Sequence, residues 1–117
     1  MKRPRIYISG RMSGLSETEI ISRFRQAELE LSVKDCKAIC PCDFMDLFVN
    51  VDMSYSDILL RDLDILSRCD GIYLLDNWKD SKGARAEKAF AEATGKSIMY
   101  QSTVYEREKK IRGGNRS

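Results

Sequence analysis

The chain has 117 residues, of which 43% are hydrophobic and 32% charged, and its 20 basic and 18 acidic residues leave a formal net charge of +2. This length suits one domain with a single core, the composition excludes a chain that is disordered throughout, and so balanced a charge does not favour a nucleic-acid surface. The sequence contains no histidine, which excludes Ser-His and Cys-His nucleophile pairs and the commonest zinc ligand. Acid–base chemistry must then rest on carboxylates, Lys, Tyr or Cys.

The first half of the sequence alternates between strand and helix patterns. Ser16 followed by Glu19 is a capping-box pattern, which predicts the start of a helix, and Pro41 predicts the end of a strand. The elements expected here are a strand over 5–9, a helix over 16–32, a short strand over 37–41 and a mixed connection over 42–53 that the pattern does not assign.

The second half continues the alternation. Ser54 and Asp57 form another capping-box pattern, and Ser81 and Gly95 bracket a third helix. The elements expected here are a helix over 54–69, a nearly continuous apolar strand over 70–76, a helix within 81–96 and a last strand over 96–101.

This alternation predicts an α/β fold, a flavodoxin- or Rossmann-like three-layer sandwich with a parallel sheet of four to five strands. We expect the domain to span 1–103 and a basic C-terminal tail to span 104–117. In such sheets ligands bind outside the carboxyl ends of the strands. The segments expected there are 9–14, 42–46, 76–81 and 101–103.

Asp62 is the first of two carboxylates in unusual positions. At about 100° per residue, it lies in the middle of the apolar sector of its helix. That sector comprises Tyr55, Ile58, Leu59, Leu63, Ile65 and Leu66. Because an unpaired buried carboxylate is costly, Asp62 is either a satisfied structural residue at the rim of the sheet or a group that faces a ligand.

Glu87 is the second carboxylate, in the third helix. It flanks the side formed by Ala86, Ala89, Phe90 and Ala93, opposite the charged side formed by Arg85, Lys88 and Glu92. The helix dipole near its start favours the ionised form. Glu87 is therefore either a dipole-balancing residue or a carboxylate nucleophile, and the pattern leaves both interpretations open.

Polar residues around the expected strand ends are weaker candidates. The turn SGRMSG offers Ser9, Gly10, Arg11, Ser13 and Gly14 as an anion-binding backbone, although a plain turn is an equal alternative. Ser81 caps the third helix and could also contact a phosphate oxygen. Trp78 on a loop suggests a ligand lid or a subunit contact, and Tyr7 could be an ordinary core residue.

The cysteines, Cys36, Cys40, Cys42 and Cys69, match no common zinc or redox spacing. We expect reduced packing or surface thiols, with a metal or redox role as the alternative, in a cytoplasmic protein that has no membrane association.

Four segments together resemble a known family. They are IYISGRMSG, RDL, CDGIYLLDNW and SKGARAEKAFAEATGK, in this order and spacing. The sequence is similar to the nucleoside 2-deoxyribosyltransferase superfamily from about residue 5 to 101, and most of all to its small uncharacterised bacterial and phage branch (DUF4406-like). Arg11 departs from the Pro usual in that branch, and GARAE departs from GxGxE on the catalytic helix.

The resemblance implies chemistry at a glycosidic bond. Glu87 matches the nucleophile that attacks C1′ of a (deoxy)ribose, Asp62 the acidic residue of the middle helix, and Tyr7 the tyrosine that orients the nucleophile. Ser81 matches a phosphate-contacting serine at the start of the same helix, where Gly83 also lies, and the 9–14 turn resembles the phosphate loop.

We therefore expect cleavage of a nucleoside 5′-monophosphate by a hydrolase or deoxyribosyltransferase. A non-catalytic nucleotide-binding or sensing module is the alternative, and it would be favoured if Glu87 were paired with Arg85 or Lys88. The expected partners are a small nucleotide or nucleoside and further copies of the chain in a homodimer or larger homo-oligomer. We expect no cofactor, no metal and no specific nucleic acid. A phospho-receiver domain is set aside, because no acidic pair follows the first strand.

Overall fold

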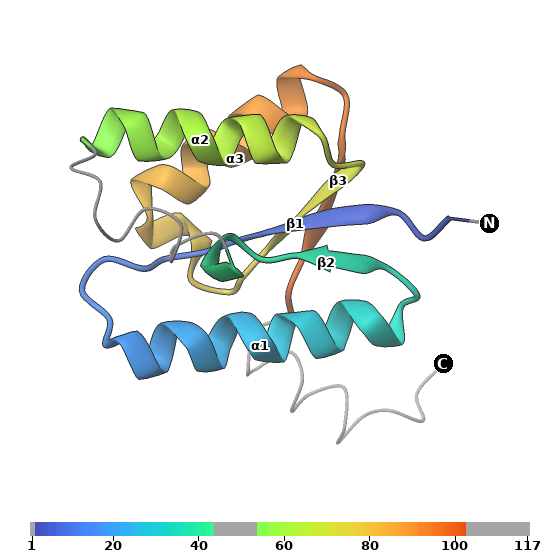
Figure 1. Cartoon of the computed structure of the whole chain (residues 1–117), viewed down its shortest axis with the longest axis horizontal. Coiled ribbons are helices and arrows are strands. Elements are labelled where there is room, and N and C mark those ends of the chain that lie inside the picture. Colours follow the sequence, from blue (N-terminus) through green and yellow to red (C-terminus); the bar gives the residue numbers. More distant parts are fainter. Residues whose placement is uncertain (1, 44–53, 103–117) are drawn as a thin grey trace.

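A computed structural model describes residues 2–43 and 54–102, in which four strands alternate with three α-helices (Figure 1). The elements are β1 (Arg5–Ser9), α1 (Glu17–Val33), β2 (Lys37–Ile39), α2 (Tyr55–Ser67), β3 (Gly71–Leu74), the 3-10 helix η2 (Trp78–Asp80), α3 (Lys82–Ala93) and β4 (Ser97–Tyr100). The predicted order is confirmed, with ends that differ by up to two residues. The expectations for most of 42–53 and for the tail over 104–117 lie outside the described residues.

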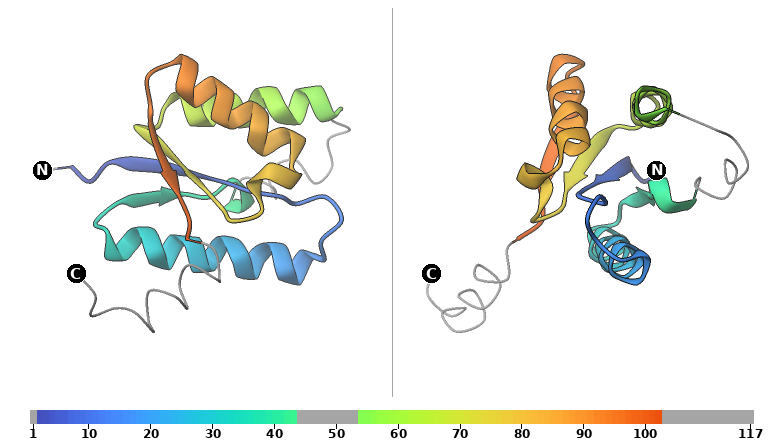
Figure 2. Two further views of the ribbon diagram at one scale, coloured as in Figure 1. Left: turned by 180° about the vertical axis from the view of Figure 1, so that it is seen from behind. Right: turned by 90° about the vertical axis from the view of Figure 1, so that its left-hand side faces the viewer.

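The sheet is parallel throughout, with the strand order β2-β1-β3-β4. The chain moves from β1 to β2 on one side and then returns to β3 on the other. Because such crossovers are right-handed, α1 covers one face of the sheet while α2 and α3 cover the other (Figure 2). This confirms the predicted three-layer α/β fold. The reversal lies between β1 and β3, and a ligand is expected at their carboxyl ends.

Alternation along β1 divides the core into two clusters. Ile6 and Ile8 pack towards α1 with Phe24, Ala27 and Leu31. On the other face Tyr7 packs with residues of β3, α2 and α3, which include Ile72, Leu74, Leu66 and Ala91. Ser9 lies two residues after Tyr7 and shares its face, because successive strand side chains alternate. Two hydroxyl groups therefore point from β1 towards α3.

Helix ends follow the sequence patterns closely. Ser54 and Asp57 form a reciprocal capping box at α2, and the Ser16 side chain accepts a hydrogen bond from the backbone N–H of Glu19 at α1. Gly95, with φ of 73°, follows α3 in the left-handed region that glycine adopts without strain.

No helix among residues 2–43 and 54–102 combines the length and apolar character needed to cross a membrane.

Two helix faces differ in part from the sequence pattern. In α2, Leu66 is buried and Leu63 and Ile65 pack against the core, whereas Tyr55 at the start of the helix is 61% exposed. The start of α2 lies beyond the carboxyl edge of the sheet (Figure 1), so its apolar side has no strand to cover. In α3 the buried residues are Ala84, Glu87 and Ala91. Alanines occur on most sides of this helix and so do not fix its orientation, and Glu87 lies in the centre of the buried face.

Candidate active site

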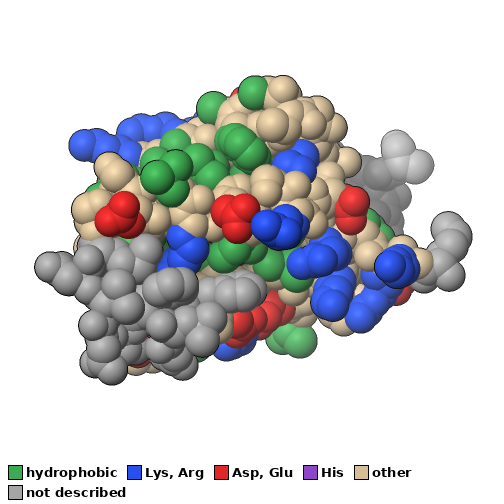
Figure 3. Space-filling view, turned by 45° about the horizontal axis from the view of Figure 1, so that its top comes forward, with side chains coloured by type: hydrophobic (Ala, Val, Ile, Leu, Met, Phe, Trp, Pro, Cys, Tyr) green, Lys and Arg blue, Asp and Glu red, His purple; other side chains and the backbone are tan. Residues whose placement is uncertain are grey.

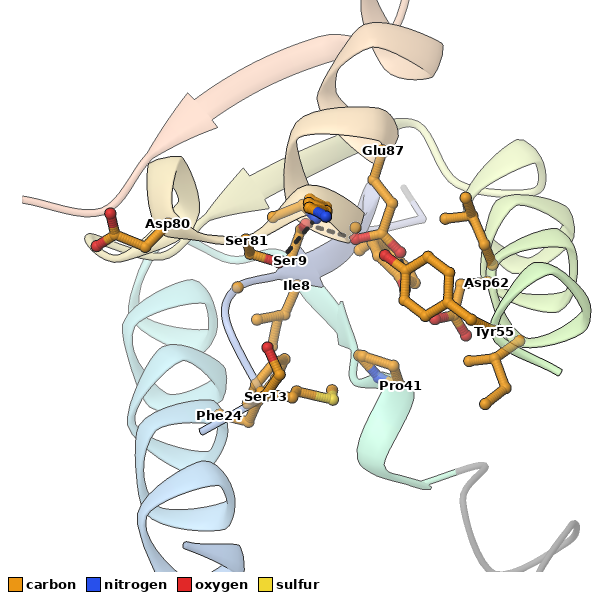
Figure 4. A pocket seen from close by; sticks show the side chains of 18 residues that line it. Ile8, Ser9, Ser13, Phe24, Pro41, Tyr55, Asp62, Asp80, Ser81 and Glu87 are labelled. Carbon is orange, nitrogen blue, oxygen red and sulfur yellow. Dashed lines mark hydrogen bonds between the residues drawn. The ribbon is translucent and has the colours of Figure 1, made fainter. Parts of the chain in front are cut away.

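A cavity of about 510 Å³ lies at the carboxyl end of the sheet (Figure 4). Its volume falls within the usual range for small-molecule sites. The walls come from the end of β1 and its following turn, from one side of α2 and from the start of α3. Among the lining residues are Tyr7, Ser9, Gly10, Ser13, Tyr55, Ile58, Leu59, Asp62, Ser81, Gly83, Ala84 and Glu87.

Glu87 is held in this cavity by the two hydroxyl groups of β1. Tyr7 Oη donates to Glu87 Oε2 at 2.7 Å, and Ser9 Oγ donates to Glu87 Oε1 at 2.6 Å. The carboxylate is only 6% exposed. Small residues one turn to either side, Ala84 and Ala91, let α3 approach the strand closely enough for these bonds. The carboxyl group therefore has a fixed position with one oxygen on each hydroxyl.

Burial dominates the ionisation of this group. It raises the pKa of Glu87 to about 7, against the lowering effect of the bonds from Ser9 and Tyr7. Burial therefore outweighs the helix-dipole effect expected from the sequence, and it favours the protonated form of Glu87. Burial and the Glu87 charge together raise the pKa of Tyr7, which keeps Tyr7 a neutral hydrogen-bond donor.

Neither neighbouring cation pairs with Glu87. Lys88 pairs with Glu92 at 3.0 Å, and Arg85 donates to the Lys79 carbonyl at 3.0 Å. The salt bridge that would have favoured a purely binding role for Glu87 is thus not formed in the described part of the chain.

Replacing Glu87 by Gln should stabilise the fold at high pH. The folded-state pKa of about 7 exceeds the ordinary 4.5, so the folded chain holds its proton more tightly than the unfolded chain. Stability is then greatest below pH 4.5 and falls as pH rises through 7. We expect Glu87→Gln to raise the free energy of unfolding by roughly 3 kcal/mol at pH 8 and to change it little at pH 4.

Urea denaturation at the two pH values measures this effect. Glu92→Gln, on the exposed side of α3, is the control and should show no comparable pH dependence. An equal effect of Glu87→Gln at both pH values would contradict a raised Glu87 pKa.

Asp62 lines the same cavity from α2 (Figure 4). Its Oδ1 accepts two hydrogen bonds from the Arg61 guanidinium, at 3.2 and 2.9 Å, and 16% of its side chain is exposed. Burial raises the pKa of Asp62, and the bonds from Arg61 partly offset the effect. The Asp62 charge in turn raises the pKa values of Tyr7 and Glu87. The three groups therefore form one electrostatic system.

Of the predicted anion-binding turn, the structure brings Ser9, Gly10 and Ser13 to the cavity, but not Arg11 and Gly14. Arg11 folds back over its own turn, because its Nε donates to the Ser13 carbonyl at 2.9 Å. Its guanidinium fills the space beside Gly14, where a Cβ would lie 2.8 Å from Nη2 and where φ is +81°. Gly10 is needed for packing, because a Cβ there would lie 2.5 Å from Leu75.

The start of α3 forms the opposite wall. Ser81 Oγ accepts a hydrogen bond from the backbone N–H of Ala84 at 3.1 Å, and Asp80, Ser81, Lys82 and Gly83 all line the cavity. Trp78 is not among the lining residues. Its ring lies 6.1 Å from that of Tyr100 and beneath the Lys79 and Lys88 ammonium groups.

Sequence reasoning missed Tyr55, Ile58 and Leu59 as cavity residues, because it described them only as part of the apolar sector of their helix. Together with Asp62 they recur at helical spacing, so α2 presents an apolar strip with a carboxylate at its end. The Tyr55 hydroxyl reaches across to α3, where a Cβ on Gly83 would lie 3.2 Å from it. The position of Asp62 among apolar residues at helical spacing was the signal that could have identified this side of α2 as a cavity wall.

Glu28, Cys40 and Asp43 place ligand atoms within 4.8 Å of one another, outside the cavity. Arg25 pairs with both carboxylates, at 2.7 Å to Glu28 and 3.0 Å to Asp43. The Arg25 guanidinium thus already pairs with the two carboxylates that would have to bind a metal ion.

Residues 4–100 match a protein-family model described as "Domain of unknown function (DUF4406)". A comparison with curated proteins found no match.

Three solved structures share the fold. A 2-desoxiribosyltransferase from Leishmania mexicana has a TM-score of 0.61 and 21% identity, over 86% of this chain and 65% of its own length. A conserved protein from Enterococcus faecalis V583 has a TM-score of 0.64 and 16% identity, over 97% of this chain and 76% of its own. A CMP N-glycosidase from Clostridium botulinum has a TM-score of 0.55 and 22% identity, over 93% of this chain and 78% of its own length.

Proposed function

The chain belongs to the DUF4406 family and has a nucleoside 2-deoxyribosyltransferase-like fold, and we propose that it cleaves the N-glycosidic bond of a (deoxy)nucleoside 5′-monophosphate. Family membership and fold agree with the resemblance inferred from the sequence. Two of the structural neighbours are described as a deoxyribosyltransferase and a nucleotide N-glycosidase, which supports glycosidic-bond chemistry. The reaction itself rests on the site.

The observation that carries the proposal is Glu87, a buried carboxylate held by two hydroxyls and without a cation partner among the described residues. Glu87 in its ionised form attacks C1′ of the sugar while the bond from C1′ to the base nitrogen breaks. The carboxylate stabilises the oxocarbenium-like transition state and then forms a covalent glycosyl ester. Tyr7 and Ser9 keep the attacking group oriented, and each carboxylate oxygen retains a lone pair beyond its hydrogen bond.

Asp62 is assigned to the leaving base. Its carboxyl either donates a proton to the departing base or stabilises that base by a hydrogen bond. Asp62, now ionised, then takes a proton from water as the water oxygen attacks C1′ and the bond to Glu87 breaks, and the products are free base and a sugar phosphate. If a second base replaces water, the same site performs transfer. Hydrolysis is the preferred outcome, because a phosphate site takes up room that a base exchanger does not need.

The phosphate is assigned to the junction of Ser13, Ser81 and the start of α3. Backbone N–H groups at a helix start attract anions, and the Lys82 side chain adds a positive charge to that wall. Figure 4 shows Ser81 and Asp62 on opposite sides of Glu87, which supports an assignment in which the sugar lies between the phosphate and the base.

One observation favours the rival function, a binding module without turnover. Both oxygens of Glu87 already accept a hydrogen bond, as they would in a purely structural role. A panel of ribo- and deoxyribonucleoside monophosphates incubated with the protein, and scored for free base by chromatography, separates the two functions. Base released from at least one nucleotide, and lost in Glu87→Ala, supports the glycosidase. Binding by calorimetry without base release supports the module.

Tyr55 is expected to contact the substrate base. An exposed aromatic ring beside a cavity offers a stacking surface, and such a contact contributes about 1–3 kcal/mol. Tyr55→Ala should therefore raise KM roughly 10-fold with a smaller change in kcat, as measured by steady-state base release. Tyr100→Ala is the control, because Tyr100 is also an exposed aromatic side chain but does not line the cavity. Equal effects of the two changes would contradict this role.

A homodimer or larger symmetric assembly is proposed, with α2 in the contact. Figure 3 shows hydrophobic side chains gathered on the side that carries α2 and α3, and Leu60 of α2 is 65% exposed without lining the cavity. Burying such a face is the usual reason for self-association. Sedimentation at micromolar concentration should show an oligomer that Leu60→Glu dissociates. A wild-type monomer would overturn the proposal.

A further inference from the structure

The segment Cys40-Pro41-Cys42 has no part in the proposed reaction, yet it forms an ordered turn directly after β2. The backbone N–H of Asp43 donates to the Cys40 carbonyl at 3.0 Å and closes the turn. Cys40 is 1% exposed, whereas Cys42 is half-buried and accessible. Pro41 between them lines the cavity. The pair thus combines one sheltered thiol with one that solvent reaches, at the cavity wall.

The four cysteines fall into two kinds. Cys36 donates its S–H to the Lys34 carbonyl at 3.6 Å, and Cys69 donates to the Ile65 carbonyl at 3.4 Å. Burial raises the pKa of Cys69. These two thiols behave as packing residues, as the sequence suggested.

Cys40 and Cys42 instead interact with each other. The neighbouring Cys40 thiol lowers the pKa of Cys42, and the nearby Arg25 guanidinium acts in the same direction. The Cys42 thiol and burial raise the pKa of Cys40. A thiolate therefore forms more readily on the accessible cysteine, which is the one that an external reagent can meet.

We propose that the Cys40-Pro41-Cys42 turn is a thiol–disulfide exchange site for low-molecular-weight disulfides, with Cys42 as the attacking thiol and Cys40 as the resolving thiol. Cysteines two residues apart in a turn have Cα atoms about 5–6 Å apart, within the range that a disulfide spans. A metal ion is the less favoured ligand, because Arg25 pairs with both nearby carboxylates.

The exchange proceeds in two balanced steps. Cys42 loses its proton, and the thiolate attacks one sulfur of the disulfide RS–SR. The S–S bond breaks, RS⁻ leaves and is protonated, and Cys42 is left in a mixed disulfide with R. The Cys40 thiol then loses its proton and attacks Cys42 Sγ, which releases the second RSH. Two protein thiols are oxidised to a disulfide, and RS–SR is reduced to two thiols.

The test is incubation of the reduced full-length protein with glutathione disulfide, followed by intact-mass and peptide mapping. Wild type should lose two hydrogen atoms and show a Cys40–Cys42 disulfide, and so should the control variants Cys36→Ser and Cys69→Ser. Cys40→Ala should instead accumulate glutathione on Cys42, and Cys42→Ser should form neither product. These readouts do not depend on glycosidase activity, so failure of the proposed function leaves them unaffected.

Alkylation of the reduced wild type gives a second measurement that needs no variant. Cys42 should react on the order of tenfold or more faster than Cys36 and Cys69 at pH 7. A stable mixed disulfide at Cys42 in the wild type, a disulfide that includes Cys36 or Cys69, or equal alkylation of the four thiols would overturn the proposal.

Discussion

Replacement of Glu87 by Ala is expected to slow base release by on the order of 10⁴-fold or more, while nucleotide binding persists. The change removes the group that stabilises positive charge at C1′ and then forms the covalent intermediate. The residues assigned to phosphate lie on other elements or at the start of α3 and are left in place. Tyr7 and Ser9 keep their positions in β1 but lose their common acceptor.

Calorimetric titration and chromatographic base release on the same preparation measure the two effects together. Glu92→Ala is the matched control, since it removes an exposed carboxylate from the same helix. Base release by Glu87→Ala at the wild-type rate would refute the proposed mechanism and leave the binding module.

The ionisation of Glu87 gives the same prediction a pH signature. Attack requires the carboxylate, so kcat/KM of the wild type should rise with pH through about 7, the pKa of Glu87 in the free protein. Since Glu87→Gln is expected to raise the free energy of unfolding at pH 8, the group that performs the chemistry also lowers the stability of the fold at that pH.

Asp62→Asn is expected to lower kcat by a factor of about 10²–10⁴, the usual contribution of a positioned acid or base. Asn keeps the size of the side chain and can still accept a hydrogen bond from Arg61, so the fold should be retained. It cannot donate the proton that a poor leaving base needs. A substrate analogue with a leaving group that needs no protonation should lose much less rate, which isolates the acid role.

Asp64→Asn is the control for this variant. Asp64 lies two residues further along α2, is exposed and pairs with Arg68 at 3.5 Å. Circular dichroism and thermal melting should show both variants folded. An Asp62→Asn protein with unchanged turnover, or one that fails to fold, would show that Asp62 is structural.

The order of elements was readable from the sequence because each signal is local. The Ser54 and Asp57 capping box, the Gly95 stop and the apolar run of β3 depend on neighbours within a few residues. The expected parallel sheet followed from the alternation of those elements. Asp62 and Glu87 stood out as candidate site residues because a carboxylate near an apolar face conflicts with local burial.

Which residues share the cavity was decided by the tertiary structure. The sequence pattern placed Tyr55 and Ile58 in the apolar sector of their helix without a partner, and in the structure α2 extends past the strand ends, where both residues line the cavity. Arg11 was expected to face a ligand, yet the Ser13 carbonyl holds it over its own turn.

Glu87 shows most clearly the difference between what the sequence revealed and what depended on the tertiary structure. Its position in a helix was readable from the sequence, but its pKa was not. Burial beneath β1 outweighs the helix dipole, and the hydroxyls of Tyr7 and Ser9 come from some 80 residues away. Hydrophobic periodicity reports on neighbours in sequence, whereas desolvation and long-range hydrogen bonds depend on which strand lies opposite.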